Sequence, residues 1–586
     1  MRTALQVSLV ILTAMVLAKV APAQAIQRTP ETHEQQWPQI GGPGAAPATI
    51  QEAIDRVIAR ENREIEVINS YRPIVESYVQ VFNPKKTEIP ILTKDYYYLG
   101  QAEMSGGRPM SYHSMLSPSD QIPKKGFTEQ NFVPLGFVRM AYIDRKGFDR
   151  QHYSFNYVGK EFLGEIRCVA FDVKPLPNAG NGRFFGRIWA EDNTYAVVRF
   201  SGIYLPVHEK GGWGSHFDSW RLNVQPDLWL PAYAFAEETD LKIHKVEIKY
   251  LNDNDRLRFK AQTRFWGYNL KEFGHEQVFS SLTVEGSAGI DDKAADALDH
   301  DQSPVGAQRQ WQSEAENNVL TALERTGMLA RVGEVDKTLD TVVNNLEVTN
   351  KLDIEPPVRC RVLTTATFDI FVMGHVIVVS RGLLDVLPDE ATLAALLAQG
   401  LGEITVSRST SERYAFYDIA QLPPLEALKR FSFRMDNRER QASSEKAMAL
   451  LQNSPYKDQL ASAGLFLKQF EKDSRNLRAL VSPHLGDRVY VASQLTSIAP
   501  ALQPGDVNQI AALPLGARIK LNPWTDEVEL TRTSTSALVS AQEKMPFEVT
   551  PFAPYLTRYT ARNSSESSPT VAHQETTYPS PSGPNK

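Results

Sequence analysis

The stretch Asp389-EATLAALLAQGLGEITVSRS-Thr410 predicts the central helix of the second half of the chain. Asp389 and Glu390 place acidic side chains at the positive end of that helix, which favours its start there. The apolar residues that follow fall on one face, and they are Leu393, Leu396, Leu397, Leu401 and Ile404. Gln399 and Glu403 are four residues apart, so a helix places one above the other beside this apolar stripe.

The same stretch resembles the active-site helix of the M48 (Ste24/HtpX-like) metallopeptidases, in which a short aliphatic run precedes His-Glu-Leu-Gly-His. In this chain the five positions are Gln399, Gly400, Leu401, Gly402 and Glu403. The resemblance covers roughly residues 358–489 and implies a mainly helical, zincin-like domain. A zinc hydrolase of this type needs two imidazoles at that spacing and a carboxylate that takes a proton from the bound water. Because all three are replaced, we expect a domain without catalysis, metal or other cofactor.

A second part of the resemblance begins at Arg438. Glu439 occupies the position of the family's metal-ligand glutamate, and Ser443 replaces the aspartate that supports the family's histidines. Three interpretations stay open for Glu403 and Glu439. They are solvated or salt-bridged carboxylates, or part of a weak site for a hard cation with Gln399 and His484, or ligands of an active site with substituted residues. We expect the first, and zinc is the cofactor only if the third holds.

The first element of the M48 resemblance is a strand pair, which matches the family's edge-strand region over the apolar runs Cys360–Leu363, Phe368–Gly374 and Val376–Leu384. In M48 peptidases the matching edge holds substrate as an added strand through main-chain hydrogen bonds, which do not need zinc. The resemblance therefore implies a peptide-binding edge at Phe371, Val372, Met373 and Gly374. An ordinary edge hairpin packed on the following helix is an equal alternative. A further hairpin is predicted at residues 515–530.

The first half of the chain predicts one helix followed by many strands. Residues 50–75 repeat apolar side chains at helical spacing, and the repeat is Ile54, Val57, Ile58, Ile65 and Ile68. From Tyr153 onward the apolar period is two. The turn Pro177–Gly182 ends in Asn-Gly and predicts a hairpin between a strand that ends at Val173 and one that begins at Arg183. We expect an antiparallel sheet with the helix on one face.

This first half resembles the LolA/LolB-like lipoprotein carriers, in which a curved antiparallel sheet wraps an apolar cavity. The order of helix and strands carries the resemblance, together with the phrases Phe184–Trp189 and Val197–Gly202. It implies lipid contact through this half, with a set of tryptophans lining the cavity: Trp189, Trp213, Trp220 and Trp229. The default for such aromatics is packing within the sheet. The predicted fold class is α+β, with an N-terminal half-barrel-like sheet and a C-terminal zincin-like domain with a small β-hairpin edge.

Length and charge limit the organisation and the partners. At 586 residues the chain is too long for one core. The predicted divisions are a signal peptide (1–25), a leader without structure (26–49), a β domain (50–277), a linker (278–310), a peptidase-like domain (311–562) and a tail without structure (563–586). The signal peptide predicts export to the periplasm or the cell exterior. The net charge of -6 without a basic run excludes nucleic acid as a partner.

The chain has 2 cysteines, Cys168 and Cys360. An oxidising compartment permits pairing, but both lie in strand-like apolar runs, so separate buried thiols are expected. The leading hypothesis is an exported M48-like pseudopeptidase that binds a peptide or protein partner in the cell envelope. The alternatives are an active metalloendopeptidase with a substituted metal site and a lipid or lipoprotein carrier.

Overall fold

The computed structural model describes residues 47, 49–83, 91–104, 110–116, 134–205, 213–244, 247–250, 259–268, 304–406, 428–429, 431–475, 477–489, 492–503, 506–514, 519–522, 527–530 and 556–558. All of them belong to one compact unit, Ala45–Lys586. The predicted signal peptide and tail lie outside the described residues, as do nearly all of the leader and most of the linker. No helix among the residues just given is both long and apolar enough to cross a bilayer. We call residues 50–268 the sheet part and residues 304–514 the helical part.

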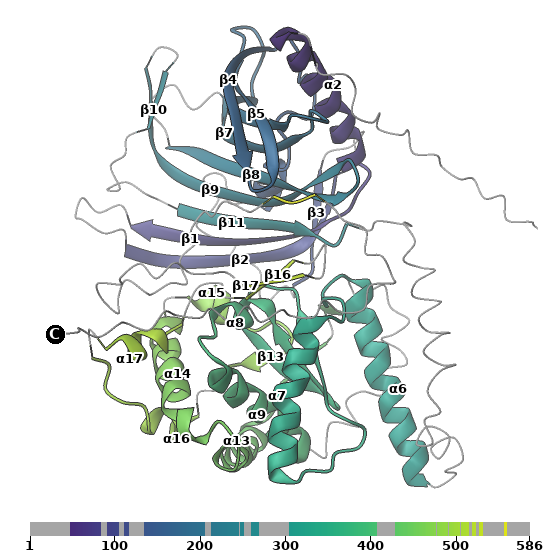
Figure 1. The fold of residues 1–586 in the computed structure, drawn as a ribbon, viewed down its shortest axis with the longest axis vertical. Helices are drawn as coiled ribbons and strands as arrows, with labels where there is room; N and C mark the ends of the chain where they lie inside the picture. The colour runs from purple at the N-terminus through teal and green to yellow at the C-terminus, as the bar shows by residue number, and fades with distance from the viewer. Residues whose placement is uncertain are drawn as a thin grey trace, which may run out of the picture. The chain divides into compact units, whose positions relative to one another are not determined.

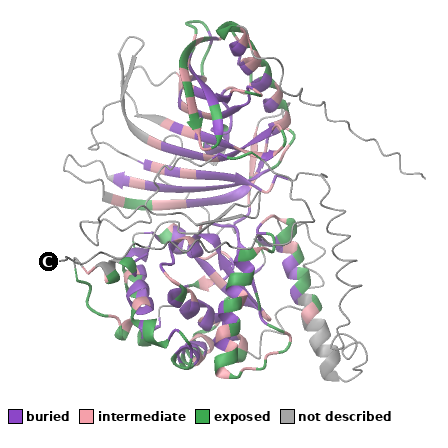
Figure 2. Ribbon diagram, viewed as in Figure 1, coloured by how far each residue is buried: buried purple, intermediate pink, exposed green. Residues whose placement is uncertain are grey.

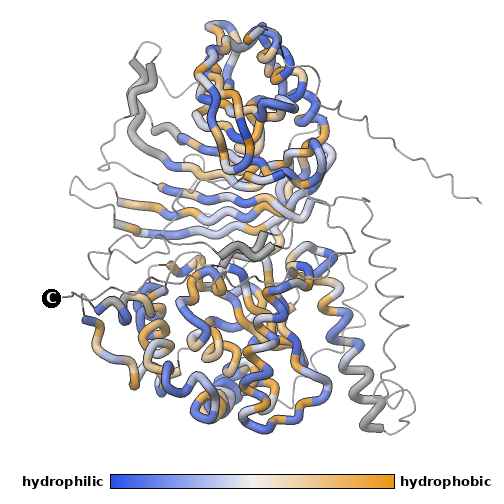
Figure 3. Tube along the Cα trace, viewed as in Figure 1, coloured by the Kyte–Doolittle hydropathy of each residue, from blue (hydrophilic) through white to orange (hydrophobic). Residues whose placement is uncertain are grey.

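The fold is α+β, as predicted, and its largest element is one antiparallel sheet of 11 strands (Figure 1). The order is β3-β2-β1-β11-β9-β8-β7-β6-β5-β4, and β10 pairs with β9. The strands are β1 (Ile74–Asn83), β2 (Ile91–Glu103), β3 (Ser111–Ser114), β4 (Tyr153–Leu163), β5 (Ile166–Pro175), β6 (Arg183–Glu191), β7 (Val197–Leu205), β8 (Trp213–Gln225), β9 (Leu228–His244), β10 (Glu247–Tyr250) and β11 (Phe259–Trp266). In the coloured parts of several of these strands, Figure 3 shows apolar and polar residues in alternation, because successive side chains point to opposite faces.

The predicted hairpin at Pro177–Gly182 joins β5 and β6, which pair in antiparallel register. Gly180 and Gly182 have φ of +89° and +79°, values at which glycine avoids the strain that other residues meet. The predicted helix over 50–75 is too long. Helix α2 spans Ile50–Ile68, with Thr49 as its N-cap, and β1 already begins at Ile74. Pro73 prevents the helix from reaching residue 75, because a proline disfavours helical conformation in the residue before it.

Helix α2 and the short helix α3 (Pro134–Arg139) cover one face of the sheet and complete its core. Charged residues are buried in this core. Arg221 donates to both oxygens of Glu61 at 2.7 Å and to Glu64 at 3.0 Å, and all three side chains have 0% exposure. Arg60 donates to the other oxygen of Glu64 at 3.1 Å. Two arginines and two glutamates therefore neutralise one another between α2 and the strands.

Stability is expected to depend on pH through Glu64. Burial raises the pKa of Glu64 from 4.5 to about 7, against the attraction of Arg221 and Arg60. A group whose pKa is raised on folding contributes stability that is fully present below its unfolded pKa and is lost as pH rises through the folded value. The shift corresponds to about 3 kcal/mol. The free energy of unfolding of the natural chain, minus that of Glu64→Gln, should therefore be smaller at pH 7.5 than at pH 4.5. Urea unfolding of both chains at the two pH values measures this difference. Glu66→Gln, at an exposed position of α2, is the control, and its stability should depend on pH as that of the natural chain does. If the stability of Glu64→Gln also ran parallel to that of the natural chain across this pH range, the expectation would be contradicted.

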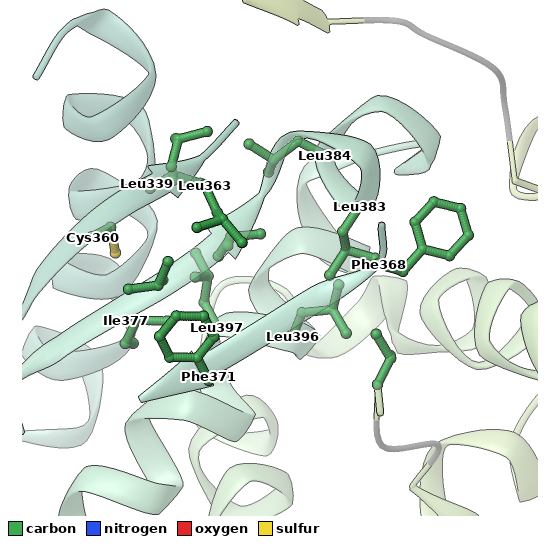
Figure 4. Close-up of a cluster of buried hydrophobic side chains, with 14 of the residues drawn as sticks. Leu339, Cys360, Leu363, Phe368, Phe371, Ile377, Leu383, Leu384, Leu396 and Leu397 are labelled. Atoms are coloured by element: carbon green, nitrogen blue, oxygen red, sulfur yellow. The ribbon is translucent and has the colours of Figure 1, made fainter. Parts of the chain in front are cut away.

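The helical part is built around a 4-stranded sheet of order β12-β14-β13-β15. Its strands are β12 (Arg359–Leu363), β13 (Asp369–Met373), β14 (Val376–Ser380) and β15 (Asp487–Arg488). The helices are α6 (Pro304–Arg325), α7 (Glu334–Asn350), α8 (Arg381–Val386), α9 (Glu390–Val406), α13 (Asn437–Gln452), α14 (Leu460–Ser474), α15 (Arg478–Val481), α16 (Ser493–Ser497) and α17 (Val507–Ala511). Figure 4 shows the aliphatic and aromatic side chains between this sheet and α9.

The structure corrects two sequence predictions for this part and confirms a third. Helix α6 begins at Pro304, inside the predicted linker (278–310). The run predicted as one strand over Val376–Leu384 is strand only to Ser380, because the Ser380 hydroxyl accepts a hydrogen bond from the Leu383 amide and starts α8. The hairpin predicted at 515–530 is confirmed as β16 (Ile519–Asn522) paired with β17 (Glu527–Leu530).

Both cysteines are free and buried, which confirms the prediction of separate core thiols. Burial is the largest cause that raises the pKa of both thiols, that of Cys168 to about 12. A thiol held neutral in this way is a poor nucleophile, so neither cysteine is suited to redox or nucleophilic chemistry.

The sheet part and the helical part are joined by a buried polar junction centred on Glu76 of β1. The Glu76 carboxylate accepts from the Tyr97 hydroxyl at 2.6 Å, from Arg264 at 2.7 Å and from the Ala366 amide at 2.6 Å. Arg264 also donates to the Thr364 carbonyl at 3.1 Å. A neighbouring contact has the same form, since the Asp95 carboxylate of β2 accepts from the Ala479 and Leu480 amides in α15.

Candidate functional site

The predicted central helix is α9, and Asp389 caps it as expected. Its carboxylate accepts from the Thr392 amide at 2.8 Å. The predicted apolar residues share one face of α9, and the structure adds that the helix is also buried on most of its other sides (Figure 2). It contacts β13 and β14 of the sheet and also α7, α13 and α14. A helix surrounded in this way needs small or apolar residues all round.

Two glycines of the family-motif positions let α9 approach its neighbours closely. A Cβ atom at Gly402 would lie 2.4 Å from the Ser443 carbonyl oxygen of α13. A Cβ atom at Gly400 would lie 3.1 Å from side-chain atoms of Ile377 on β14. Gly400 therefore faces the sheet, and Gly402 marks the point where the main chains of α9 and α13 meet. No side chain fits between the two helices there.

Gln399 faces a small cavity of about 20 Å³ between α9, β13, α13, α14 and α16. Apart from Gln399 and Ser444, the lining is apolar: Ile370, Ala395, Leu396, Ala447, Met448, Leu451, Leu467, Ala492 and Leu495. The Nε2 atom of Gln399 is buried and makes no hydrogen bond to a described residue. A volume of this size has room for about one water molecule, so a peptide does not fit into it.

Replacing Gln399 with methionine is expected to raise the free energy of unfolding by about 1 kcal/mol. Methionine has a similar shape, fills the apolar cavity and removes the cost of the buried Nε2 donor, which is about 1–3 kcal/mol for an unsatisfied group. Urea unfolding would measure the change. Gln441→Met on α13 is the control, because Gln441 is exposed and its Nε2 atom donates to Glu445 of the same helix. This change should alter stability by less than about 0.5 kcal/mol. A loss of stability in Gln399→Met would mean that the amide is well solvated.

The two carboxylates of the predicted site have different surroundings. Glu403 is buried, with 7% exposure. Glu439 is half-buried at the start of α13, where its carboxylate accepts from the Asp436 amide at 3.2 Å and closes a capping box. In this position Glu439 stabilises the end of its own helix. Within the described part of the chain, no three His, Cys, Asp or Glu side chains are grouped so that they could hold a metal ion.

His484, the nitrogen donor of the hard-cation interpretation, does not line the Gln399 cavity. Its ring stacks on Tyr97 of the sheet part, with 5.0 Å between centroids and an interplanar angle of 18°. Its amide donates to Asp369, which is fully buried. Burial raises the pKa of Asp369 from 3.8 to about 6, although the amides of His484 and Gly486 oppose that shift. His484 therefore belongs to the contact between the two parts.

The predicted binding edge is strand β13. Beyond β14, β13 pairs only with the two residues of β15, at Asp369 and Ile370, so no described strand pairs with Phe371–Met373 on that side. These residues are nevertheless only 0–3% exposed. The Phe371 ring stacks on Phe433 at 4.7 Å. A peptide would have to displace Phe433 to reach this edge, and Gly374 at its end is only half-buried. The edge stays a prediction.

Sequence reasoning missed the buried charged groups of Glu61 and Glu76. For Glu61 a signal was present, because it continues the helical spacing set by Ile54, Val57 and Ile65. For Glu76 the signal was mixed. One face of β1 carries Glu76 and Gln80 between the apolar residues Ile74 and Tyr78, and the helical part covers this face, so both polar residues are buried.

No family model matches this chain, and no curated protein matches it. Among solved structures, a putative outer membrane lipoprotein-sorting protein domain from Vibrio parahaemolyticus aligns over 40% of this chain and 98% of its own, with 8% identity and a TM-score of 0.22. A DUF1329 family protein from Desulfovibrio piger ATCC 29098 aligns over 38% of this chain and 95% of its own, with 8% identity and a TM-score of 0.20. The first has the description expected from the resemblance of the sheet part, but both TM-scores are too low to assign a fold or a function to this chain.

Proposed function

We propose that this chain is an exported, non-catalytic protein of the cell envelope that binds a peptide or protein, and that its helical part is a zincin-like domain derived from an M48-type peptidase. The observation that carries the proposal is the crossing of α9 and α13 at Gly402 and Ser443. This crossing contains Gly402, the glycine that this chain shares with the family motif His-Glu-Leu-Gly-His. The positions of the motif that would do chemistry are used for packing instead.

Two replaced positions have packing roles, since Gln399 faces an apolar cavity and Gly400 abuts Ile377. The retained glutamate, Glu439, caps its own helix. A catalytic zinc needs an open coordination position for water, whereas these residues lie against neighbouring elements. A peptidase-like domain without its metal still has the surface that binds a peptide. A peptide would add as a strand along the unpaired part of β13.

Zinc retention and peptide cleavage test the proposal against an active peptidase. After incubation with zinc and dialysis, the natural chain should hold less than about a tenth of the zinc held by the double variant Gln399→His and Glu403→His. That variant restores two imidazoles four residues apart, with Glu439 as the third ligand. The natural chain should not cleave unfolded protein substrates. Bound zinc together with cleavage that disappears in Glu403→Ala would overturn the proposal.

A second candidate, a lipid or lipoprotein carrier, is favoured by one observation. Edge strand β4 exposes three apolar side chains, Tyr157, Val158 and Phe162, with exposures of 37%, 39% and 69%. Against it, the core between the sheet and α2 is filled by buried side chains, among them the edge-to-face rings of Phe184, Phe200 and Phe217. Acyl chains extracted from the purified protein and identified by mass spectrometry would favour this candidate.

A further inference from the structure

The outer face of the large sheet carries a second apolar core, on the side opposite α2. Its buried members are Ile166, Cys168, Ala170, Trp189, Ala196, Val198, Trp220, Trp229, Phe235 and Leu556. Nine of these residues come from strands β5 to β9 or the turns between them. The tenth, Leu556, comes from the C-terminal region, more than 300 residues away in sequence, and has 0% exposure. The face therefore contains a place for one leucine that the sheet itself does not supply.

Three contacts of different chemistry hold this segment. The Leu556 side chain is part of the apolar cluster. Its carbonyl oxygen accepts a hydrogen bond from the Glu165 amide at 2.9 Å, in the turn between β4 and β5. Two residues later, Arg558 forms an ion pair with Glu191 at the end of β6. Thr557, between them, is exposed. Alternate residues thus face the sheet, as in a peptide bound in extended form.

Glu191 makes the site selective for a cation. Its side chain has 0% exposure, whereas that of Arg558 is 51% exposed. A buried carboxylate is costly unless a positive group and hydrogen bonds compensate it. The Thr194 hydroxyl donates to the second carboxylate oxygen of Glu191, and Arg558 supplies the positive charge. The buried carboxylate is therefore part of the sheet, and the arginine side chain approaches it from the surface.

We propose that the outer face of the sheet part is a binding site for an extended peptide segment with leucine and, two residues later, arginine, and that the chain's own Leu556–Arg558 fills it in cis. The apolar cluster selects the leucine, the Glu165 amide fixes the main chain, and Glu191 selects the arginine. The segment is a separable ligand, because its described contacts are with the sheet part alone. The site is distinct from β13 and does not depend on the proposed loss of catalysis.

A labelled peptide with the sequence of residues 551–560 tests this site by fluorescence anisotropy. In the full-length chain, a tethered segment competes at an effective concentration of about millimolar. The variant Leu556→Ala with Arg558→Ala loses that competitor, so it should bind the peptide at least tenfold more tightly than the natural chain does. Peptides carrying Leu556→Ala or Arg558→Glu should bind at least tenfold more weakly to the same variant. Adding Glu191→Gln to the variant should also weaken binding of the natural peptide.

Circular dichroism and the urea midpoint show whether the double variant is folded. A folded variant that does not bind the peptide, or that binds the altered peptides equally well, would overturn the proposal. If the double variant does not fold, hydrogen exchange on the natural chain decides. Excess peptide should speed exchange in the chain's own residues 556–558 while the Glu165 amide stays protected. Unchanged exchange at millimolar peptide would also overturn the proposal.

Discussion

Replacing Glu76 with alanine is expected to lower the free energy of unfolding by about 3–5 kcal/mol. Glu76 is 2% exposed, and its carboxylate receives three hydrogen bonds, from Tyr97, Arg264 and the Ala366 amide. Its removal leaves the charge of Arg264, which is only 3% exposed, without its anion. Burial and then the nearby charge of Arg381 already lower the pKa of Arg264. The variant would therefore retain two buried like charges.

A double variant separates the cost of leaving Arg264 without an anion from the net contribution of the Glu76–Arg264 ion pair to stability. Glu76→Leu with Arg264→Met removes both charges and keeps apolar volume, and replacing a buried ion pair in this way is often nearly neutral. It should be more stable than Glu76→Ala by at least about 2 kcal/mol. Urea unfolding of the natural chain, Glu76→Leu alone, Arg264→Met alone and the double variant completes the cycle.

Glu103→Ala is the matched control for Glu76→Ala. Glu103 lies on β2 of the same sheet and pairs with Arg72 at 2.9 Å, but the two side chains are 30% and 64% exposed. An exposed pair contributes about 0–1 kcal/mol. If Glu76→Ala cost no more than Glu103→Ala, the junction between the two parts would not depend on the buried carboxylate. Limited proteolysis should also become faster in Glu76→Ala, because the variant weakens contacts at Thr364 and Ala366.

Local rules predicted much of the fold. The Asn-Gly turn predicted the β5–β6 hairpin, and Asp389 predicted the start of α9, because turn and cap chemistry act within a few residues. The change to period-two alternation predicted the antiparallel sheet. Where a local signal was overlooked, an element was mistaken, as at Ser380, whose hydroxyl caps α8 where a continued strand was expected.

The rest depended on contacts between distant residues. Glu76 meets Ala366 across 290 positions, and the alternation along β1 does not show which distant residues will cover the face that carries Glu76. Leu556 lies in a stretch without periodicity, so nothing local marks it as a core residue. At the candidate site the sequence identified which motif positions were replaced. It did not show that Gly400 faces Ile377 and that Gly402 meets Ser443, because side-chain identity does not give the orientation of a helix surrounded on all sides.

Replacing Gly402 with alanine is expected to lower the free energy of unfolding by about 3 kcal/mol, the upper part of the range for overpacking a core. The added Cβ atom would lie 2.4 Å from the Ser443 carbonyl oxygen and 3.2 Å from the Ala447 amide nitrogen. Both are main-chain atoms, which a rotamer change does not move. Helix α13 must therefore shift away from α9 along the whole crossing. The gain in helix propensity, about 1 kcal/mol for glycine to alanine, offsets only part of this cost.

Gly400→Ala is the control, because it adds the same methyl group two residues earlier in the same helix. There the new Cβ atom lies 3.1–3.3 Å from three side-chain atoms of Ile377, which can move by a few tenths of an ångström. Propensity and crowding then nearly cancel, and the change should stay within about 1 kcal/mol. Urea unfolding of both variants measures the contrast. Equal effects would mean that α9 and α13 are not in close main-chain contact, which would remove the observation on which the peptidase-derived fold is proposed.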